Sequence, residues 1–390
     1  MIVQHKSTIS KLLAKINNLS KCVGVVSYTV LKEKIEQTYS NTLWLTPESL
    51  ESTLRFDTHT VLSSTKIFVV GTDIFTNPYR APMFDFSLLR IHIYNPLIDI
   101  IPIKLKNEDW LFEEIFSKKI NSYSSTVFRN SRRFFFIVSS RHDMLEWYER
   151  LRKKFENLVP LTGSLPTKLI CKVILETGYP IICTKDVAFK YSKSEDCLVK
   201  LPSIHRIKEN KLKVNSLDCS DMCLILGFEK RINTPQALVK IIPKYYEYSP
   251  KNVATKIKEL TSLGLLHQFP SRILSPTLLG KTVIRNFLTV FTTKIFLEMD
   301  EASFNIPFQL LPEFSQEKWI EEKLLHHQGS LRQLLELESI RKKVWITNAL
   351  LQLSSVTKRF NLFNLISEIR DELKERKDVL MKNFVQKIGV

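Results

Sequence analysis

Short apolar runs separated by helical stretches recur through the first half of this 390-residue chain, and they constrain its fold more than any other feature. Each run has the length of a buried strand, and strands that alternate with helices are typical of α/β domains with a largely parallel sheet. We therefore predict an α/β N-terminal half. The expected strands lie in CVGVVSY (22–28), KIFVVGTDIF (66–75), LLRIHIYNPLIDIIPI (88–103), RFFFIVSS (133–140), KLICKVIL (168–175) and PIICTKDVAF (180–189).

Changes in composition predict four parts of the chain. The polar stretch at 118–133 has the composition of a linker or an exposed basic loop, and the charged stretch at 190–216, interrupted by Pro202, has that of a boundary. From about 217 onward the spacing of apolar residues is helical, apart from a strand-like break near 268–274. The predicted parts are an α/β domain at 1–130, a second α/β unit at 131–205, a helical unit at 217–292 and a helical bundle at 300–390.

A strong positive charge predicts a polyanionic partner. The 57 Lys and Arg residues outnumber the 40 Asp and Glu residues, which gives a net charge of +17. Basic side chains that neutralise phosphates release counterions, so this balance favours nucleic acid as the partner. The alternative is that the charge serves only to keep the protein soluble.

Cysteines and apolar segments indicate a reducing compartment. The six cysteines show no spacing typical of a zinc site, so no metal is expected and free thiols are the default. The N-terminus lacks the apolar core of a signal peptide, and no apolar run has the length needed to cross a bilayer. We expect a soluble protein of the cytoplasm, or one associated with the nucleoid, that has no membrane partner.

The helical unit contains three pairs in which a serine or threonine directly precedes a proline. Thr234-Pro235, Ser249-Pro250 and Ser275-Pro276 each place a capping hydroxyl before a proline, which is typical of a helix start. The helix that starts at Ser249 has an apolar stripe on one side and closes at Gly264. Residues 265–274 can form two short strands, after which another helix follows.

This order resembles the winged-helix DNA-binding family over residues 218–292. The resemblance implies a positioning helix at 234–242, a recognition helix at 249–263 that enters the major groove, and a β-wing at 265–274. Most of the implied contacts are with phosphate, while Asn252 could read a base edge. The implied DNA-binding residues are Lys251, Asn252, Thr255, Lys256 and Lys258 on the recognition helix and Arg272 on the wing. Winged helices also serve as protein–protein modules, and a lysine-rich helix face can be simply solvated.

The sequence SPTLLGKT at 275–282 ends like a phosphate-binding loop. That loop needs a glycine where Ser275 stands, and Pro276 removes a backbone N–H that a phosphate would use. We therefore interpret Gly280 as a small residue in a packed helix and Lys281 as an exposed charge. Glycine is scarce throughout, at nine residues, which also argues against glycine-rich phosphate loops.

The α/β half also resembles superfamily 2 helicases, with RecA- or Rossmann-like sheets. The segment RRFFFIVSSRHDMLEWYERLRKKFENLVPLTGS resembles the start of the second RecA-like domain, and some such helicases continue with a winged helix and a helical bundle. The catalytic elements of the family are missing. There is no Walker A loop and no arginine-finger motif, and Ile93-Tyr94-Asn95-Pro96 stands where an Asp-Glu pair would bind Mg²⁺. We expect no catalytic residues and no cofactor.

A second resemblance is to CRISPR-associated proteins that join a Rossmann-like domain to a winged helix and sense a nucleotide. Because α/β sheets bind ligands at the carboxyl ends of their strands, this resemblance implies ligand loops near Gly71 and Ser139. The residues concerned are Thr72, Asp73, Ser139, Ser140 and Arg141.

These patterns together predict a DNA-binding protein without its own catalysis, a subunit or regulator in DNA processing or antiviral defence. Its expected partners are DNA, with RNA as an alternative, and other protein subunits of a nucleic-acid-processing complex. The competing hypotheses are a divergent helicase-type ATPase, a CRISPR-associated effector subunit or nucleotide-sensing regulator, and a structural subunit that uses the winged helix for protein contacts.

Overall fold

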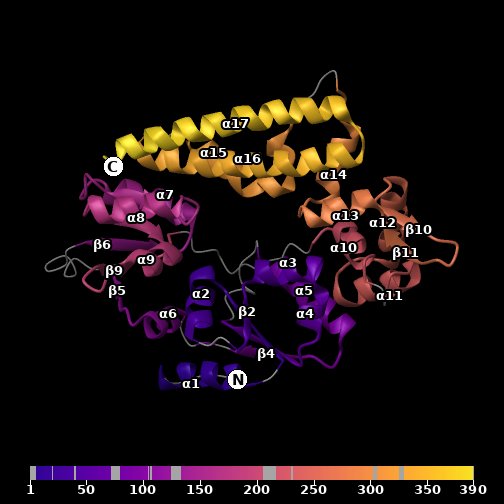
Figure 1. The fold of residues 1–390 in the computed structure, drawn as a ribbon, viewed down its shortest axis with the longest axis horizontal. Coiled ribbons are helices and arrows are strands. Elements are labelled where there is room, and N and C mark those ends of the chain that lie inside the picture. The colour runs from indigo at the N-terminus through magenta and orange to yellow at the C-terminus, as the bar shows by residue number, and fades with distance from the viewer. Residues whose placement is uncertain are drawn as a thin grey trace.

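The computed structural model describes most of the chain. The described residues are 6–19, 21–38, 41–71, 80–103, 105, 108–123, 133–204, 217–229, 232–301, 305–324 and 329–389. Figure 1 shows the arrangement of their elements.

The first α/β unit contains a parallel four-stranded sheet in the order β2-β1-β3-β4. Its strands are β1 (Cys22–Val26), β2 (Leu43–Leu45), β3 (Lys66–Val70) and β4 (Asp99–Ile103). The associated helices are α1 (Lys6–Asn17), α2 (Thr29–Thr38), α3 (Pro47–Phe56), α4 (Thr58–Leu62), α5 (Ala81–Tyr94) and α6 (Glu108–Phe116). Strand β1 is buried along its whole length, as expected for the interior of a parallel sheet. Gly24 is required there, since a Cβ at this position would lie 2.3 Å from the Trp44 ring.

The second α/β unit contains a parallel five-stranded sheet in the order β5-β9-β6-β8-β7. Its strands are β5 (Ile120–Ser122), β6 (Phe134–Val138), β7 (Val159–Leu161), β8 (Ile181–Thr184) and β9 (Cys197–Lys200). The helices α7 (Arg141–Leu151), α8 (Thr167–Glu176) and α9 (Lys185–Tyr191) connect its strands. Buried aromatic and aliphatic residues of β6 and β8 form the centre of its core. The prediction of parallel α/β structure in the N-terminal half is confirmed.

The described residues from Cys219 onward are mainly helical. The first group of elements comprises α10 (Cys219–Leu226), α11 (Pro235–Tyr245), α12 (Pro250–Ser262), β10 (Leu266–Gln268), β11 (Leu274–Pro276), α13 (Leu278–Arg285) and α14 (Val290–Glu298). The rest consists of two short 3-10 helices (Phe308–Leu310 and Pro312–Phe314), α15 (Ser315–Leu324), α16 (Ser330–Val356) and α17 (Phe360–Lys387). The expected helical C-terminal region is confirmed.

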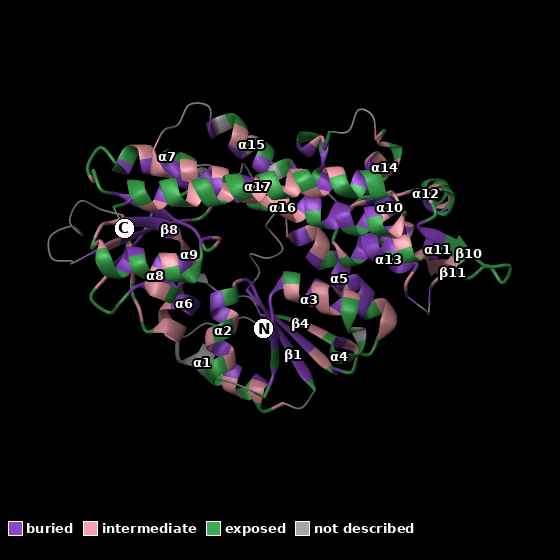
Figure 2. Cartoon of the chain, turned by 45° about the horizontal axis from the view of Figure 1, so that its top comes forward, coloured by how far each residue is buried: buried purple, intermediate pink, exposed green. Residues whose placement is uncertain are grey.

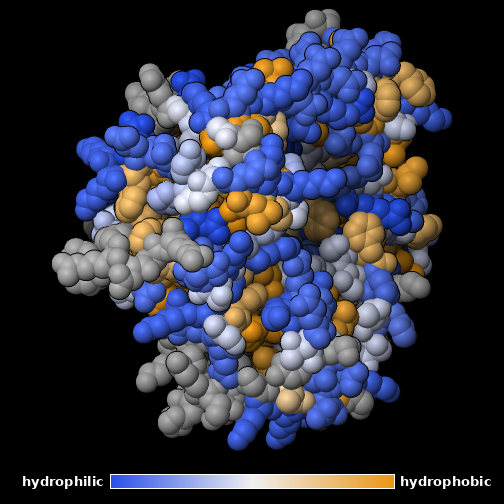
Figure 3. All heavy atoms as spheres, turned by 60° about the vertical axis from the view of Figure 1, so that its left-hand side comes forward, coloured by the Kyte–Doolittle hydropathy of each residue, from blue (hydrophilic) through white to orange (hydrophobic). Residues whose placement is uncertain are grey.

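The long helices α16 and α17 lie side by side and extend from the second α/β unit to helices α13 and α14 (Figure 1). Helix α16 contacts strand β7 near one end and helix α13 further along. Figure 2 shows buried residues concentrated in the strands and on the inner faces of the helices, while α17 exposes much of its outer side. Figure 3 shows one face covered mainly by hydrophilic side chains, with apolar atoms in small separate patches.

Several predicted elements in the α/β half differ from the structure. KLICKVIL (168–175) forms helix α8, not a strand, because Ile170, Val173 and Ile174 repeat at helical spacing and are buried together. Only the end of the run at 88–103 is a strand, since its first part belongs to helix α5. In the run at 180–189 the strand stops at Thr184, and helix α9 follows at once.

The two expected boundaries also contain strands of the second sheet. Strand β5 lies within 118–133, and strand β9 lies within 190–216 and pairs with both β5 and β6. Strand β9 buries only Cys197, Leu198 and Val199 between charged residues, so its apolar signal is short. The stretch that was expected to separate domains therefore supplies an interior strand.

The third predicted helix start is wrong. Ser275 and Pro276 belong to strand β11, where Leu266 pairs with Pro276, and Thr277 instead caps helix α13 by accepting the N–H of Gly280 at 3.0 Å. The interpretation of Gly280 is confirmed, because a Cβ there would lie 2.2 Å from the carbonyl oxygen of Leu265. Lys281 is exposed, as expected.

Candidate nucleic-acid interface

Helices α11 and α12 begin with the predicted caps. The hydroxyl of Thr234 accepts the N–H of Ala237 at 3.2 Å, and the hydroxyl of Ser249 accepts the N–H of Asn252 at 3.1 Å. Proline occupies the first position of each helix, where a backbone N–H would have no acceptor within the helix, so its absence costs no hydrogen bond. The buried residues that hold the two helices against α10 are Leu238, Ile242, Val253, Ile257 and Leu260.

A short antiparallel hairpin follows α12. Helix α12 ends before Gly264, whose φ of +70° is the left-handed conformation that glycine favours. Strands β10 and β11 then pair, with Leu266 and Leu274 buried beneath them. The tip between them is exposed and carries Phe269, Ile273 and the predicted contact residue Arg272. Figure 1 shows the hairpin at the end of the molecule away from the second α/β unit.

Four of the predicted residues lie on the outer side of α12. Lys251, Asn252, Thr255 and Lys258 are all exposed. The hydroxyl of Thr255 donates to the carbonyl of Lys251 at 2.9 Å, so this hydroxyl already has a partner within the helix. The side chains of Lys251 and Lys258 form no ion pair with the described residues, and they are the available cations of this face.

Lys256 has a different environment from the other lysines of α12. It is half-buried, and its ammonium lies 2.9 Å from a carboxylate oxygen of Glu259. The hydrogen bond to Glu259 raises the pKa of Lys256, and the same bond lowers the pKa of Glu259. Lys294 of α14 also lies 3.6 Å from Glu259, so Lys256 shares its carboxylate with a second cation. Its charge is therefore partly compensated at close range.

The predicted ligand loop after β6 is closed by internal bonds. Ser140 caps helix α7 by accepting the N–H of Asp143 at 3.1 Å, and the buried carboxylate of Asp143 accepts the N–H of Ile204 at 3.0 Å. Arg141 pairs with Glu338 at 3.0 Å, and Ser139 is exposed. The other two predicted ligand residues, Thr72 and Asp73, lie outside the described residues.

The turn between β1 and α2 is the place where a phosphate would meet a doubly wound sheet of this kind. Here the start of α2 at Val30 lies beside the carboxylate of Asp186 from the second α/β unit. Burial raises the pKa of Asp186, and the nearby Val30 N–H opposes this effect. Beside it Arg80 donates to both carboxylate oxygens of Glu48, at 2.6 and 2.9 Å, and to the carbonyl of Ser27 at 2.8 Å.

These contacts at the edge of the first sheet were not predicted from the sequence. Asp186 and Val30 are far apart in the chain, and nothing local to DVAF marks Asp186 as the partner of a helix start. The one local feature that argued against a phosphate-binding turn was the lack of glycine after β1, where the chain continues as Ser27-Tyr28.

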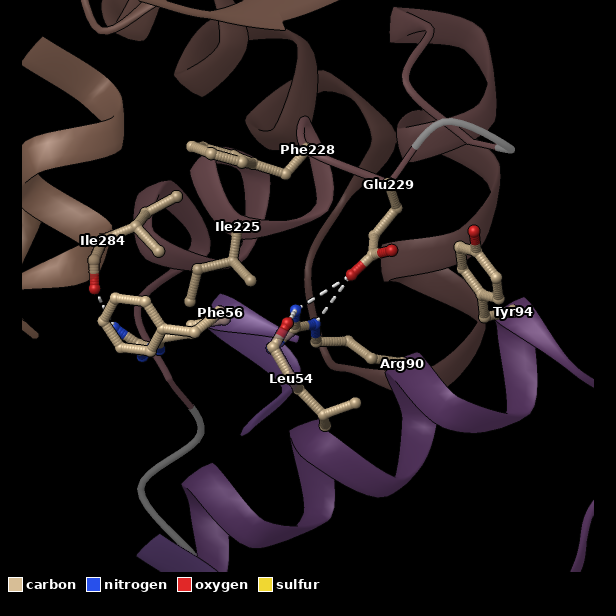
Figure 4. Close-up of a pocket in the computed structure, with 9 residues that line it drawn as sticks. Leu54, Phe56, Arg90, Tyr94, Ile225, Phe228, Glu229 and Ile284 are labelled. Atoms are coloured by element: carbon tan, nitrogen blue, oxygen red, sulfur yellow. Dashed lines mark hydrogen bonds and ion pairs between the residues drawn. The ribbon is translucent and has the colours of Figure 1, made fainter. Parts of the chain in front are cut away.

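A buried network of charged residues joins the first α/β unit to the α10–α13 unit (Figure 4). Arg90 of α5 lies 3.2 Å from Glu51 of α3 and 2.9 Å from Glu229, and it donates to the carbonyl of Leu54 at 2.9 Å. Arg55 pairs with the same Glu51 at 2.6 Å. Arg55 also donates to the carbonyl of Ile284 at 2.7 Å and stacks on the Phe287 ring. The network lines a pocket of about 280 Å³ and holds helix α13 against α3.

Asp221 in α10 makes the stability of this unit depend on pH. Burial raises the pKa of Asp221 from 3.8 to about 7, against the opposing effect of the Val290 N–H, which donates to it at 2.7 Å. Between these two values the folded protein holds a proton that the unfolded chain has lost. The free energy of unfolding contributed by this group therefore falls as pH rises, by about 1.4 kcal/mol per pH unit, and stays constant above pH 7.

Replacing Asp221 with asparagine is expected to remove this dependence, because the amide oxygen can still accept the Val290 N–H. Urea unfolding should show that the stability of D221N relative to the native protein is greater at pH 8 than at pH 5 by about 2–3 kcal/mol. Asp378→Asn, at an exposed position of α17, serves as the control and should have no such effect. A stabilisation of D221N that is the same at both pH values would contradict the assignment.

The chain matches no protein-family model, and no curated protein matches it. Among the described residues no group of His, Cys, Asp and Glu side chains is arranged to hold a metal ion. None of the described helices is both long enough and apolar enough to cross a membrane.

Proposed function

We propose that residues 219–285 form a winged-helix module that binds duplex DNA, with α12 as the recognition helix and the β10–β11 hairpin as the wing. The observation that carries the proposal is the exposed side of α12, which presents Lys251, Asn252 and Lys258 next to a hairpin with Arg272 at its tip. Helices of this kind enter the major groove with their N-terminal residues against the bases, while basic side chains contact phosphates.

The lysines of α12 have different roles in this proposal, because only some of them have a carboxylate nearby. Lys251 and Lys258 have no carboxylate partner among the described residues, so they are the principal phosphate contacts. Lys256 contributes less, because Glu259 compensates its charge. Asn252 is exposed near the start of the helix, where a side-chain amide can pair with the edge of an adenine.

We further propose that the chain acts without hydrolysing ATP. In support of this, the carboxylate of Asp186 lies beside the start of α2, and Ser27-Tyr28 stands where a glycine-rich turn would be. A phosphate at this position would lie next to a group of the same charge.

A second candidate function is contact with a protein partner through the hairpin. Phe269 and Ile273 are 45% and 41% exposed at its tip, and exposed apolar side chains are common in protein interfaces. This surface would make the chain a structural subunit of a larger complex.

Salt dependence separates the two functions. Duplex DNA is expected to bind the purified chain at low salt, with an affinity that falls linearly on a log–log plot as salt rises, because phosphate neutralisation releases counterions. A gel-shift series with duplex DNA, single-stranded DNA and RNA measures this slope. Absence of duplex binding at low salt would overturn the DNA proposal and favour the protein partner.

A further inference from the structure

A pocket of about 480 Å³ lies between helix α16 and the carboxyl edge of the second sheet. Its lining from the sheet side is Arg141, which follows β6, and Ser164, which follows β7; both loops lie at the same edge because the sheet is parallel. The lining residues from the helices are Glu317, Glu338, Arg341, Lys342 and Trp345. Ligands of open α/β sheets bind outside this edge, and the volume is that of a small-molecule site.

Both acidic residues of the pocket lie against the same arginine. Glu338 lies 3.0 Å from Arg141 and accepts the hydroxyl of Ser164 at 2.7 Å, and Glu317 lies 3.5 Å from Arg141. Both glutamates are buried. Arg141 pairs with both carboxylates, and the three cations and two anions of the lining leave the pocket with a net charge of +1.

Two cations of the pocket have no carboxylate partner among the described residues. Arg341 is exposed and uses one Nη atom to donate to the carbonyl of Ser164, which fixes the guanidinium beside the loop after β7. The ammonium of Lys342 lies 4.2 Å from the centre of the Trp345 ring, which holds it by a cation–π contact. Burial lowers the pKa of Lys342, and the carboxylates of Glu317 and Glu313 oppose that effect, as a bound anion would.

The loop after β7, which contributes Ser164 to the pocket lining, also carries neutral donors. It reads Thr162-Gly163-Ser164, and within the described part of the chain the N–H groups of Gly163 and Ser164 donate to no protein acceptor. A Cβ at Gly163 would meet nothing within 4 Å, so the space beside this loop is open. Consecutive backbone N–H groups in a turn are a common anion-binding arrangement.

We propose that this pocket binds the phosphate group of a phosphoester, with Arg341 and Lys342 as its cationic partners and the N–H groups of Gly163 and Ser164 as neutral donors. The phosphate can belong to a free nucleotide or to a single-stranded nucleic acid, since both present the same chemistry. The site is separate from the outer face of α12, so it does not depend on the proposed duplex binding.

Calorimetric titration of the full chain tests the proposal with AMP, inorganic phosphate and adenosine, and with one oligonucleotide prepared with and without a 5′-phosphate. We expect binding of AMP and no binding of adenosine if the source is a free nucleotide. We expect binding of the oligonucleotide that strengthens with its 5′-phosphate if the source is a nucleic-acid end. In either case the affinity must fall by at least about tenfold in the double variant Arg341→Gln and Lys342→Gln, because this variant removes charge-assisted hydrogen bonds to the phosphate.

Matched variants keep the result interpretable. Lys382→Gln and Lys387→Gln, at exposed positions of α17, make the same change in charge and should bind as the native chain does. Substitution of Lys251 and Lys258 should weaken duplex binding and leave AMP binding unchanged, so the two proposals fail separately. Binding of adenosine as tight as that of AMP, a double variant that binds normally, or no phosphate compound bound at millimolar concentration would each overturn the proposal.

Discussion

Replacing Arg90 with methionine is expected to lower the free energy of unfolding by about 3–5 kcal/mol, the usual effect of removing one partner from a buried ion network. Arg90 is 4% exposed, and its guanidinium compensates Glu51 and Glu229, which are 1% and 9% exposed in their side chains. Without it both carboxylates stay buried, although Glu51 keeps Arg55 as a partner. Urea denaturation followed by circular dichroism measures the change.

The matched control is Arg152→Met, at the residue that directly follows helix α7. Arg152 lies 2.9 Å from Glu149, but the two side chains are 48% and 32% exposed, so loss of this pair should cost less than about 1 kcal/mol. Glu51→Gln and Glu229→Gln in the R90M background should recover part of the loss, since neutral amides are cheaper to bury than unpaired carboxylates. Equal effects of R90M and R152M would show that the network does not stabilise the contact between α5 and the α10–α13 unit.

Reversing the charges of Lys251 and Lys258 together is expected to weaken duplex DNA binding by at least about 50-fold near 0.1 M salt. Loss of two phosphate contacts removes about two units from the slope of log affinity against log salt, and the new carboxylates add repulsion. Gel shifts over a salt series measure both the affinity and the slope.

Two comparisons make this prediction specific. Lys374→Glu with Lys382→Glu on α17 changes the net charge equally and should have a much smaller effect if α12 is the contact. Lys256→Gln should change affinity less than about threefold, because Glu259 already compensates Lys256. An unchanged affinity in the Lys251 and Lys258 double variant would move the DNA contact to another surface.

Local sequence patterns predicted the helix starts at Thr234 and Ser249 because a capping hydroxyl and a following proline act within one turn. The same pattern failed at Ser275, where pairing of β11 with β10 overrides the local preference for a helix start. Helix α5 was missed for a different reason. Its two faces pack against different cores, so it is apolar all round and lacks the one-sided stripe that marks a surface helix.

Some contacts of the candidate sites could not be predicted, because they join distant segments. The pairing of Lys256 with Glu259 is local, since the two residues are three apart in α12, and the sequence could have indicated it. The approach of Lys294 to the same carboxylate depends on how α14 packs against α12, which one helix does not specify. The pocket beside Arg341 likewise requires α16 to lie against the loop after β7. The sequence predicted Arg141 as a ligand residue of the loop after β6, but it does not show that α16 packs beside that loop.

Helix α16 has 27 residues, and at about 1.5 Å per residue it is about 40 Å long. It touches β7 and α13, and α17 packs along it. The two packed helices therefore fix the distance between the proposed phosphate pocket and the unit that carries the β10–β11 hairpin. A proline in the middle of α16 would break the helix and release this distance. A nucleic acid strand bound at both sites would then no longer be held at a fixed spacing.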